Sequence, residues 1–239
     1  MKPVIVMTQT SKVQSDMVEV IHKPFIKIQS LEFDTQLLHD NYDWLIFSSK
    51  NAVHLFYKYL EYVNVKHIAV VGAKTAQLCK QLGINIDFIP NDYSQEGLLE
   101  GLNLEKSSIL IPSSAQARPK LQQSLAEHNN VVKIDLYTPI ADRENIIEVI
   151  NLIQHNQVEA LTFSSSSAVR YYFSEAFPKH FKNYYAIGQQ TANSIRAYGY
   201  EPYIADKQTS EALINTFLES RNKSVSYTHL RAHETRGNI

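Results

Sequence analysis

The sequence predicts an α/β protein that contains a duplicated unit and parallel sheets. Short β-branched runs alternate with amphipathic segments along most of the chain, and one polar motif occurs twice. Residues 47–53, FSSKNAV, return as residues 163–169, FSSSSAV, a shift of 116 positions. The same shift places Gly72 on Gly188 and Thr75 on Thr191. A register kept over about fifty residues indicates two related domains rather than a short solenoid repeat.

The expected elements follow from periodicity and from β-branched content. The expected strands are residues 4–7, 25–28, 44–47, 67–71, 86–89, 108–111, 131–137, 159–163, 184–187 and 202–205. The expected helices are residues 73–82, 115–128, 143–154 and 189–198. Because strands and helices alternate strictly, we expect parallel strands joined by right-handed crossovers. Gly83 and Gly199 follow two of these helices and are expected to adopt left-handed caps.

Length and charge restrict the class of protein. A chain of 239 residues is long enough for two domains. Its 23 Lys and Arg balance 24 Asp and Glu, so no net field attracts nucleic acid or an anionic membrane. Cys79 is the only cysteine, which excludes an intrachain disulfide, and its place on an apolar helical face predicts a core residue. No signal-peptide pattern or membrane-spanning run is present, so we expect a cytoplasmic protein.

Known cofactor and nucleophile motifs are missing from the sequence. The histidines lie in separate elements without metal-ligand spacing. There is no glycine-rich dinucleotide motif, no phosphate-binding loop of the Walker type and no Gly-x-Ser-x-Gly turn. The sequence therefore predicts neither a metal nor a cofactor, and it disfavours hydrolysis by a catalytic triad.

Polar strand-to-helix turns are the strongest candidates for a binding site. Residues 48–51 and 164–167 each follow an apolar strand and begin a helix, where free N–H groups and the helix dipole favour carboxylates. The turns at Gly72 and Gly188 repeat this design. Any one serine here would serve equally well as a helix cap alone. The candidate ligand-binding residues in these turns are Ser48, Ser49, Lys50, Asn51, Gly72, Thr75, Ser164, Ser165, Ser166, Ser167, Gly188, Gln190 and Thr191.

Two further side chains have a possible functional role. Tyr137 is expected to end a long strand just before Pro139, where its phenol could donate a proton or could simply be a packing residue. Arg118 follows a polar turn at the expected start of a helix. It could pair with a carboxylate in bidentate fashion, or it could be a solvated surface arginine.

Four motifs in order resemble the uroporphyrinogen-III synthase family. They are residues 44–53, 70–76, 163–169 and 186–192, and the resemblance extends from about residue 3 to about residue 219. It implies two flavodoxin-like parallel-sheet domains joined by a two-stranded connection, with an active site in the interdomain cleft. One domain would contain residues 1–33 and 140–221, and the other residues 34–139. Residues 222–239 have no counterpart in the repeat and are interpreted as a non-native or disordered tail.

The resemblance also implies an activity. It is the cyclisation of linear hydroxymethylbilane to uroporphyrinogen III, a cofactor-independent lyase reaction of haem biosynthesis that inverts ring D and releases water. Tyr137 would be the candidate acid, Thr75 and Thr191 would line the cleft, and Thr8 would bind substrate at the end of the first strand. Many relatives have Thr-Arg at that point, whereas this chain has Thr8 and Gln9.

The resemblance implies a monomer that binds this linear tetrapyrrole, which the preceding deaminase would hand over. The alternative prediction is a non-catalytic two-domain binder of an anionic small molecule, because the same turns would bind such a ligand without a strong catalytic group.

Overall fold

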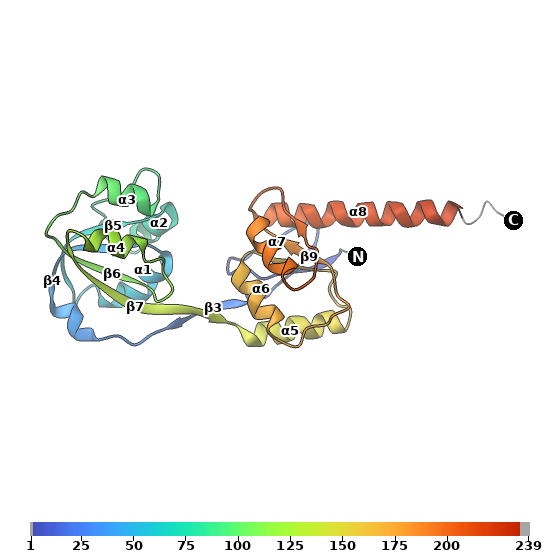
Figure 1. Cartoon of the computed structure of the whole chain (residues 1–239), viewed down its shortest axis with the longest axis horizontal. Helices are drawn as coiled ribbons and strands as arrows, with labels where there is room; N and C mark the ends of the chain where they lie inside the picture. Colours follow the sequence, from blue (N-terminus) through green and yellow to red (C-terminus); the bar gives the residue numbers. More distant parts are fainter. Residues whose placement is uncertain (1, 235–239) are drawn as a thin grey trace. The chain divides into compact units, whose positions relative to one another are not determined.

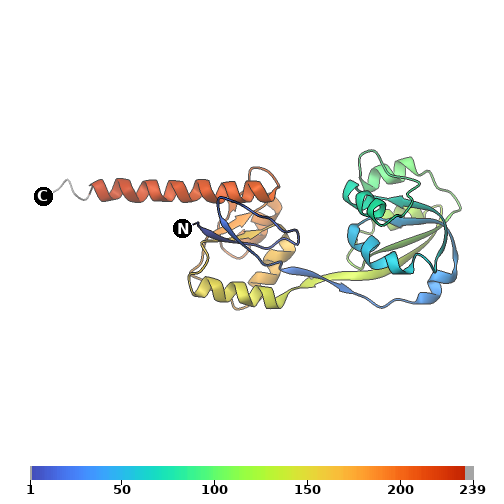
Figure 2. The same ribbon diagram turned by 180° about the vertical axis from the view of Figure 1, so that it is seen from behind.

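A computed structural model describes residues 2–234 (Figures 1 and 2). The chain divides into two compact units. Residues up to Lys27, together with those from Ile140 onward, form unit 1, and Ile28–Pro139 form unit 2. Each unit contains one five-stranded sheet.

The sheet of unit 1 is parallel throughout. Its strands are β1 (Val4–Met7), β2 (Glu19–His22), β8 (Ala160–Phe163), β9 (Tyr184–Ala186) and β10 (Tyr203–Ile204). Their order is β10-β9-β8-β1-β2, which is the order of flavodoxin-like sheets. In sheets of this class, ligands bind beyond the carboxyl ends of the strands, where the strand order reverses.

Helices pack on both faces of this sheet. They are α5 (Arg143–Gln154), α6 (Ser166–Phe173), α7 (Gln189–Arg196) and α8 (Ser210–Glu234). Successive strand residues point to opposite faces. Val6 therefore packs in an aromatic-rich cluster with α5, α6 and α7, whereas Ile5 and Met7 pack against Leu213 and Phe217 of α8. Burying each such side chain contributes about 2 kcal/mol to folding.

Unit 2 has the same three-layer design. Its strands are β3 (Ile26–Ser30), β4 (Asn41–Phe47), β5 (Asn64–Val70), β6 (Ser108–Ser114) and β7 (Asn130–Ala141). Their order is β3-β7-β6-β4-β5. The helices are α1 (Lys50–Phe56), α2 (Ala73–Gln81), α3 (Gln95–Gly101) and α4 (Lys120–Ala126), with the short 3₁₀ turns η1 (Thr35–His39) and η2 (Tyr57–Tyr59). One core cluster lies against α1 and α2 and the other against α3 and α4.

The repeat predicted from sequence is confirmed in the backbone. Helices α1 and α6 begin at Lys50 and Ser166, and α2 and α7 begin at Ala73 and Gln189, in each case 116 residues apart. Within the sheets, β4, β5 and β6 occupy the places that β8, β9 and β1 occupy in unit 1.

The two expected helix caps are also confirmed. Gly83 and Gly199 both have positive φ, at 73° and 84°. Only glycine adopts such angles at little cost, which is why each residue ends its helix and lets the chain return to the sheet.

The expected strict alternation of strands and helices is wrong at the start of the chain, up to Ser30. Strands β1, β2 and β3 follow one another without a helix, and β2 was not predicted. The reason is that Glu19–His22 has a mixed polar pattern with only intermediate burial, because β2 is an edge strand. The expected strand at 86–89 is reduced to one bridge, between Ala69 and Phe88.

Strand β7 departs from expectation because it continues past Tyr137 to Ala141. Backbone bonds from Leu31 N to Leu136 O and from Asp142 N to Phe25 O show that β3 runs antiparallel to it, so the sheet is not wholly parallel. Pro139 has no N–H to donate, but no hydrogen bond to β6 is lost, because the pairing of β7 with β6 ends at Tyr137 and Ser114. Each of the two unit boundaries therefore falls within a strand, β3 or β7.

The two remaining differences concern helix bounds. The helix expected at 115–128 begins only at Lys120, because residues 115–118 form a turn and Pro119 is the N-cap. Residues 222–234 continue α8 as helix and so differ from a disordered segment, while the other expectation, that this tail is non-native, stays a prediction. The segment has no Gly or Pro to end a helix. The remainder of that expected tail, residues 235–239, lies outside the described residues.

Candidate functional site

The polar turns of unit 1 line a cavity of about 440 Å³ at the carboxyl ends of β8 and β9. We call residues 164–167 and 188–191 the unit 1 rim. The lining residues are Ser164, Ser165, Ser166, Ser167, Arg170, Ile187, Gly188, Gln190, Thr191 and Gln208. Seven of the expected ligand-binding residues, all those of residues 164–167 and 188–191 that were predicted, therefore line one cavity. This cavity exposes hydroxyl, amide and guanidinium groups and no carboxylate.

Ser165 is the N-cap of α6, and its Oγ accepts a hydrogen bond from Ala168 N at 3.2 Å. The neighbouring Ser166 Oγ donates to the Gln190 carbonyl at 3.3 Å, which connects the two turns of the rim. Arg170 Nη2 donates to Ser167 Oγ at 3.0 Å. A guanidinium has further N–H donors in the same plane, so Arg170 can still bind a carboxylate.

Thr8 lies beside this rim but takes part in the backbone structure. It is 2% exposed, and its Oγ1 donates to the Thr162 carbonyl at 2.8 Å, which joins the ends of β1 and β8. Gln9, at the position of the expected arginine, is also buried, and its Oε1 has no hydrogen-bond partner among the described residues. Neither side chain is among those that line the cavity.

The corresponding turns of unit 2, residues 48–51 and 72–75, form the unit 2 rim. Ser49 is the N-cap of α1, and its Oγ accepts from Ala52 N at 3.1 Å. The same Oγ lies 2.8 Å from the hydroxyl of Tyr137. Tyr137 reaches it from β7, where it pairs with Ser114 of β6, and is 6% exposed. Unit 2 thus brings together two residues that the sequence predicted separately.

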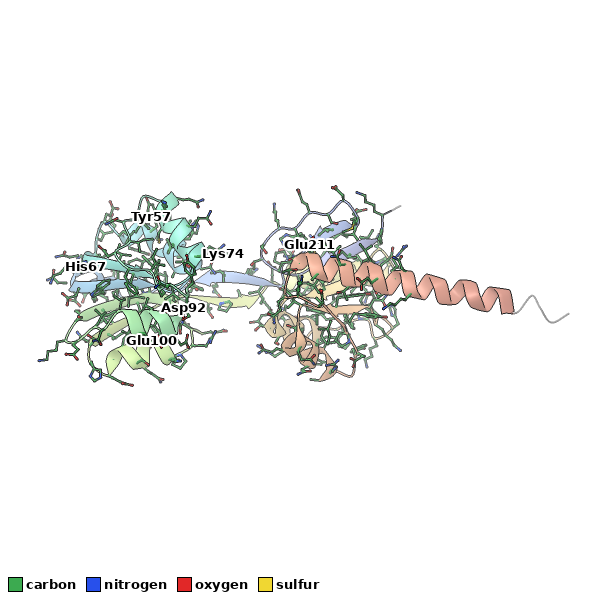
Figure 3. All side chains as sticks on the ribbon, turned by 90° about the horizontal axis from the view of Figure 1, so that it is seen from above. Tyr57, His67, Lys74, Asp92, Glu100 and Glu211 are labelled. Atoms are coloured by element: carbon green, nitrogen blue, oxygen red, sulfur yellow. The ribbon has the colours of Figure 1, made fainter. Side chains whose placement is uncertain are left out.

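Lys50 and Asn51 point to a different part of unit 2. They line a cavity of about 470 Å³ between α1 and α2 together with His54, Lys74, Gln77, Leu78 and Gln81. Figure 3 labels Lys74 on α2, at the opposite side of unit 2 from His67 of β5. Among the described residues, Lys50, His54 and Lys74 make no ion pair.

The other predicted residues are separate from these cavities. Thr75 is buried at 4% exposure, and Ser48 and Gly72 are partly buried. Arg118 is exposed in the turn before α4 rather than in the helix. Near it, Lys120 donates to Glu96 and, with a smaller effect from Arg118, holds the pKa of that carboxyl below its usual range.

Sequence reasoning missed Arg170, Gln208, His54 and Lys74, which line the two cavities. The repeat contained a signal for Lys74, because the 116-residue shift places it on Gln190, which was predicted. The same shift places His54 on Arg170, so a prediction of either residue would have found the other. Gln208 carried no such signal. It belongs to an irregular loop that meets Gly188 only through the fold.

Cys79 is buried in the core of unit 2, as predicted, and burial raises the pKa of its thiol to about 11. A thiol that remains protonated at neutral pH is a poor nucleophile. Across residues 2–223, whose side chains the structure describes, no cluster of three or more metal-ligating side chains is formed. Over the same residues, no helix combines the length and apolar character needed to cross a membrane.

The fold and the two cavities define a class of protein: a duplicated α/β chain with hydroxyl, amide and basic side chains at the strand-to-helix turns of both units. The family model described as uroporphyrinogen-III synthase HemD matches residues 10–215. The chain therefore belongs to the uroporphyrinogen-III synthase family.

Individual relatives agree with this assignment. A putative uroporphyrinogen-III synthase of Methanocaldococcus jannaschii is 32% identical over 192 residues, covering 73% of this chain and 78% of that protein. The porphyrin biosynthesis protein HemD of Ruminiclostridium josui is 26% identical over 220 residues, covering 84% of this chain. The chain spans only 44% of that longer relative.

A solved structure is similar in fold. The crystal structure of uroporphyrinogen-III synthetase from Helicobacter pylori superposes with a TM-score of 0.61 at 20% sequence identity, covering 92% of this chain and 99% of that one. At this identity the similarity supports the α/β fold with two parallel-rich sheets and carries nothing about individual site residues.

Proposed function

We propose that this chain is a lyase that cyclises hydroxymethylbilane to uroporphyrinogen III, with inversion of ring D and release of water. The family assignment supports the reaction. The two rims support the substrate class, because hydroxyl, amide and basic groups suit a ligand that carries carboxylates on every ring. We further propose that one tetrapyrrole contacts both rims, as the expected interdomain site requires.

The hydrogen bond between Ser49 and Tyr137 is the observation that carries the mechanism. Ser49 Oγ already accepts from Ala52 N, and its own proton can be donated to the Tyr137 oxygen. In that arrangement the phenol proton is free to point at a ligand. Tyr137 would transfer it to the departing hydroxyl of the substrate, so that water leaves and the phenolate accepts the Ser49 hydrogen bond.

Little acid strength is needed for this step. A pyrrole nitrogen expels the protonated hydroxymethyl oxygen as water and leaves a cationic azafulvene. The substituted α-carbon of ring D attacks this azafulvene and forms a spirocycle. The bond from that carbon to its original methylene bridge then breaks, which gives a second azafulvene, and the free α-carbon of ring D closes on it and loses its proton. The more difficult requirement is geometric, because ring closure without control gives the uninverted isomer. Holding the carboxylates in place fixes the fold of the flexible tetrapyrrole before the bond forms.

Fixed dipoles at the rims would assist the later charged species as well. The N–H groups at the starts of α6 and α7 and the neighbouring hydroxyls are already oriented, so they need no reorganisation during the reaction. This mechanism uses no cofactor, since proton transfer and the formation and cleavage of carbon–carbon bonds suffice, with no change in overall oxidation state. We also propose that the chain acts as a monomer and can receive its substrate from the deaminase that makes it.

The test is a product analysis. The purified full-length chain is mixed with freshly generated hydroxymethylbilane, and the uroporphyrinogen isomers are oxidised and separated by chromatography. We expect isomer III to dominate, and heat-denatured protein gives the isomer I background. An isomer I product at high protein concentration would reject the reaction and leave the alternative, a non-catalytic binder of an anionic small molecule.

A further inference from the structure

The two cavities overlap under the 116-residue shift, and we call them the unit 1 groove and the unit 2 groove. Lys50, Asn51, His54 and Lys74 of the α1–α2 cavity correspond to Ser166, Ser167, Arg170 and Gln190. All four of these counterparts line the cavity of unit 1. The unit 2 groove continues between α1 and α2 to residues whose counterparts do not line the unit 1 groove. The duplication has therefore kept four lining positions together with the starts of the helices that carry them.

The copies differ in charge. The unit 2 groove contains Lys50, Lys74 and His54, whereas the unit 1 groove contains Arg170 as its basic side chain. No Asp or Glu lines either groove. A carboxylate placed between α1 and α2 would therefore meet two ammonium groups that have no ion-pair partner among the described residues.

The groove also has neutral donors suited to the same ligand. Asn51 on α1 and Gln77 and Gln81 on α2 can each donate from a side-chain amide. Leu78 provides a partly buried apolar floor, which would suit the methylene groups of an acetate or propionate side chain. Basic groups at the edge, amides and an apolar floor together match a short carboxyalkyl group.

We propose that the groove between α1 and α2 is a carboxylate-binding subsite, in which Lys74 and Lys50 hold acetate or propionate side chains of the tetrapyrrole. The subsite rests on the proposed function for the identity of its ligand. It assigns most of the charge attraction for the substrate to unit 2, while the unit 1 groove binds through hydroxyls, amides and Arg170.

The repeat itself supplies the variant. Lys74→Gln gives the unit 2 groove the side chain that unit 1 has at Gln190, and Lys80→Gln is its control. Lys80 is also exposed on α2 but does not line the groove. We expect Lys74→Gln to raise KM about fivefold with little change in kcat, because an exposed charged contact is lost from both ground and transition states. We expect Lys80→Gln to behave like the unaltered chain.

Combining Lys74→Gln with Lys50→Ser copies both unit 1 side chains into unit 2, and we expect KM to rise about thirtyfold if the two contacts add. Both increases should shrink when salt is raised from about 0.05 M to about 0.5 M, because exposed charge pairs are screened. A KM for Lys74→Gln equal to that of the unaltered chain, at low salt, would overturn the subsite while the proposed function remains.

A binding measurement separates the subsite from the reaction. Fluorescence titration with uroporphyrin, which has a carboxylate pair on every ring, is compared with coproporphyrin, which has half as many carboxylates. We expect Lys74→Gln to weaken uroporphyrin about fivefold and coproporphyrin less, since fewer carboxylates reach the groove. If the chain fails to make isomer III, the proposed function fails and this titration still decides the subsite. Equal uroporphyrin affinities for Lys74→Gln and Lys80→Gln would refute it.

Discussion

The two units share a backbone design but not their side-chain chemistry. Ser49 and Ser165 cap equivalent helices with almost identical backbone angles, φ −156° and ψ 155° against φ −156° and ψ 150°. Only Ser49 contacts a phenol, however, and only the unit 2 groove contains two lysines. The duplication has therefore kept the places where ligand groups can bind, while the groups at those places have diverged.

The cores differ as well. In unit 1 the rings of Phe163, Tyr172, Phe173 and Tyr184 pack directly against one another, whereas the buried rings of unit 2 lie mostly among aliphatic side chains. The Tyr172 and Tyr184 hydroxyls are buried without a hydrogen-bond partner among the described residues. Unit 1 is thus expected to tolerate charge in its core less well than unit 2.

The largest expected effect is loss of unit 1 at alkaline pH. Burial raises the pKa of Tyr184 to about 12 and that of Tyr185 to about 12, from 10.0 in the unfolded chain. Because the folded pKa is the higher one, their contribution to stability is fully present below pH 10 and falls as pH rises towards 12. We expect helical circular dichroism to fall before the emission of Trp44, the only tryptophan and a residue of unit 2, shifts to the red.

The matched variants for this titration are Tyr184→Phe and Tyr93→Phe. Removing the buried hydroxyl of Tyr184 should move the alkaline transition to higher pH, because one buried phenol fewer then loses its proton. Tyr93 is 52% exposed and lies in unit 2, so its variant should titrate like the unaltered chain. A transition in which both signals change together, at the same pH for all three proteins, would refute the difference between the cores.

The second-largest expected effect is a fall in kcat when the phenol of Tyr137, beside the unit 2 rim, is removed. We expect Tyr137→Phe to fold normally and to lose about 100-fold in kcat, the low end for a general acid with a good leaving group. Single-turnover formation of isomer III measures this step. Tyr59→Phe, also in unit 2, is the control because Tyr59 contacts Phe33 and Phe56 rather than the rim. A nearly full rate for Tyr137→Phe would show that its phenol is not the acid.

The glycines of the two rims should differ in their response to alanine. Gly72 has φ 92°, which side chains rarely adopt, so Gly72→Ala should cost about 1–3 kcal/mol of unfolding free energy. Gly188 is extended at φ −177°, and a Cβ there would meet the Gln208 side chain, with Nε2 at 3.3 Å and Cδ and Cγ at 3.4 Å. Gly188→Ala should therefore cost less than about 1 kcal/mol, since a flexible side chain can move away. Urea unfolding midpoints measure both, and equal losses would contradict the asymmetry.

The smallest expected effects separate the two capping serines. Ser49→Ala and Ser165→Ala should each cost about 1 kcal/mol of stability, because each removes one helix cap. Only Ser49→Ala should also slow the reaction, by about tenfold, because it removes the hydrogen bond to Tyr137. Thermal unfolding and kcat are measured on the same preparations. Equal kcat values for the two variants would mean that Ser49 is a cap and nothing more.

Much of the fold could be read from the chain because local rules produce it. The repeat at residues 47–53 and 163–169 predicted the duplicated helices, and Gly83 and Gly199 predicted the caps, since their positive φ values follow from a local need. Strand β2 could not be predicted because it is an edge strand, and its residues lack the apolar pattern by which a buried strand is identified.

By itself, the sequence determined the α/β class and the polar turns, because both depend on neighbours within about ten residues. It also determined the duplication, because similar residues recur in the same order 116 positions apart. Only the tertiary structure decided which of those turns share a cavity and which partner each side chain meets. Tyr137 and Ser49 are 88 residues apart, and Gln208 meets Gly188 from a loop without any pattern. Such pairs depend on strand order and register, and these depend on how the whole core packs rather than on the residues beside each site.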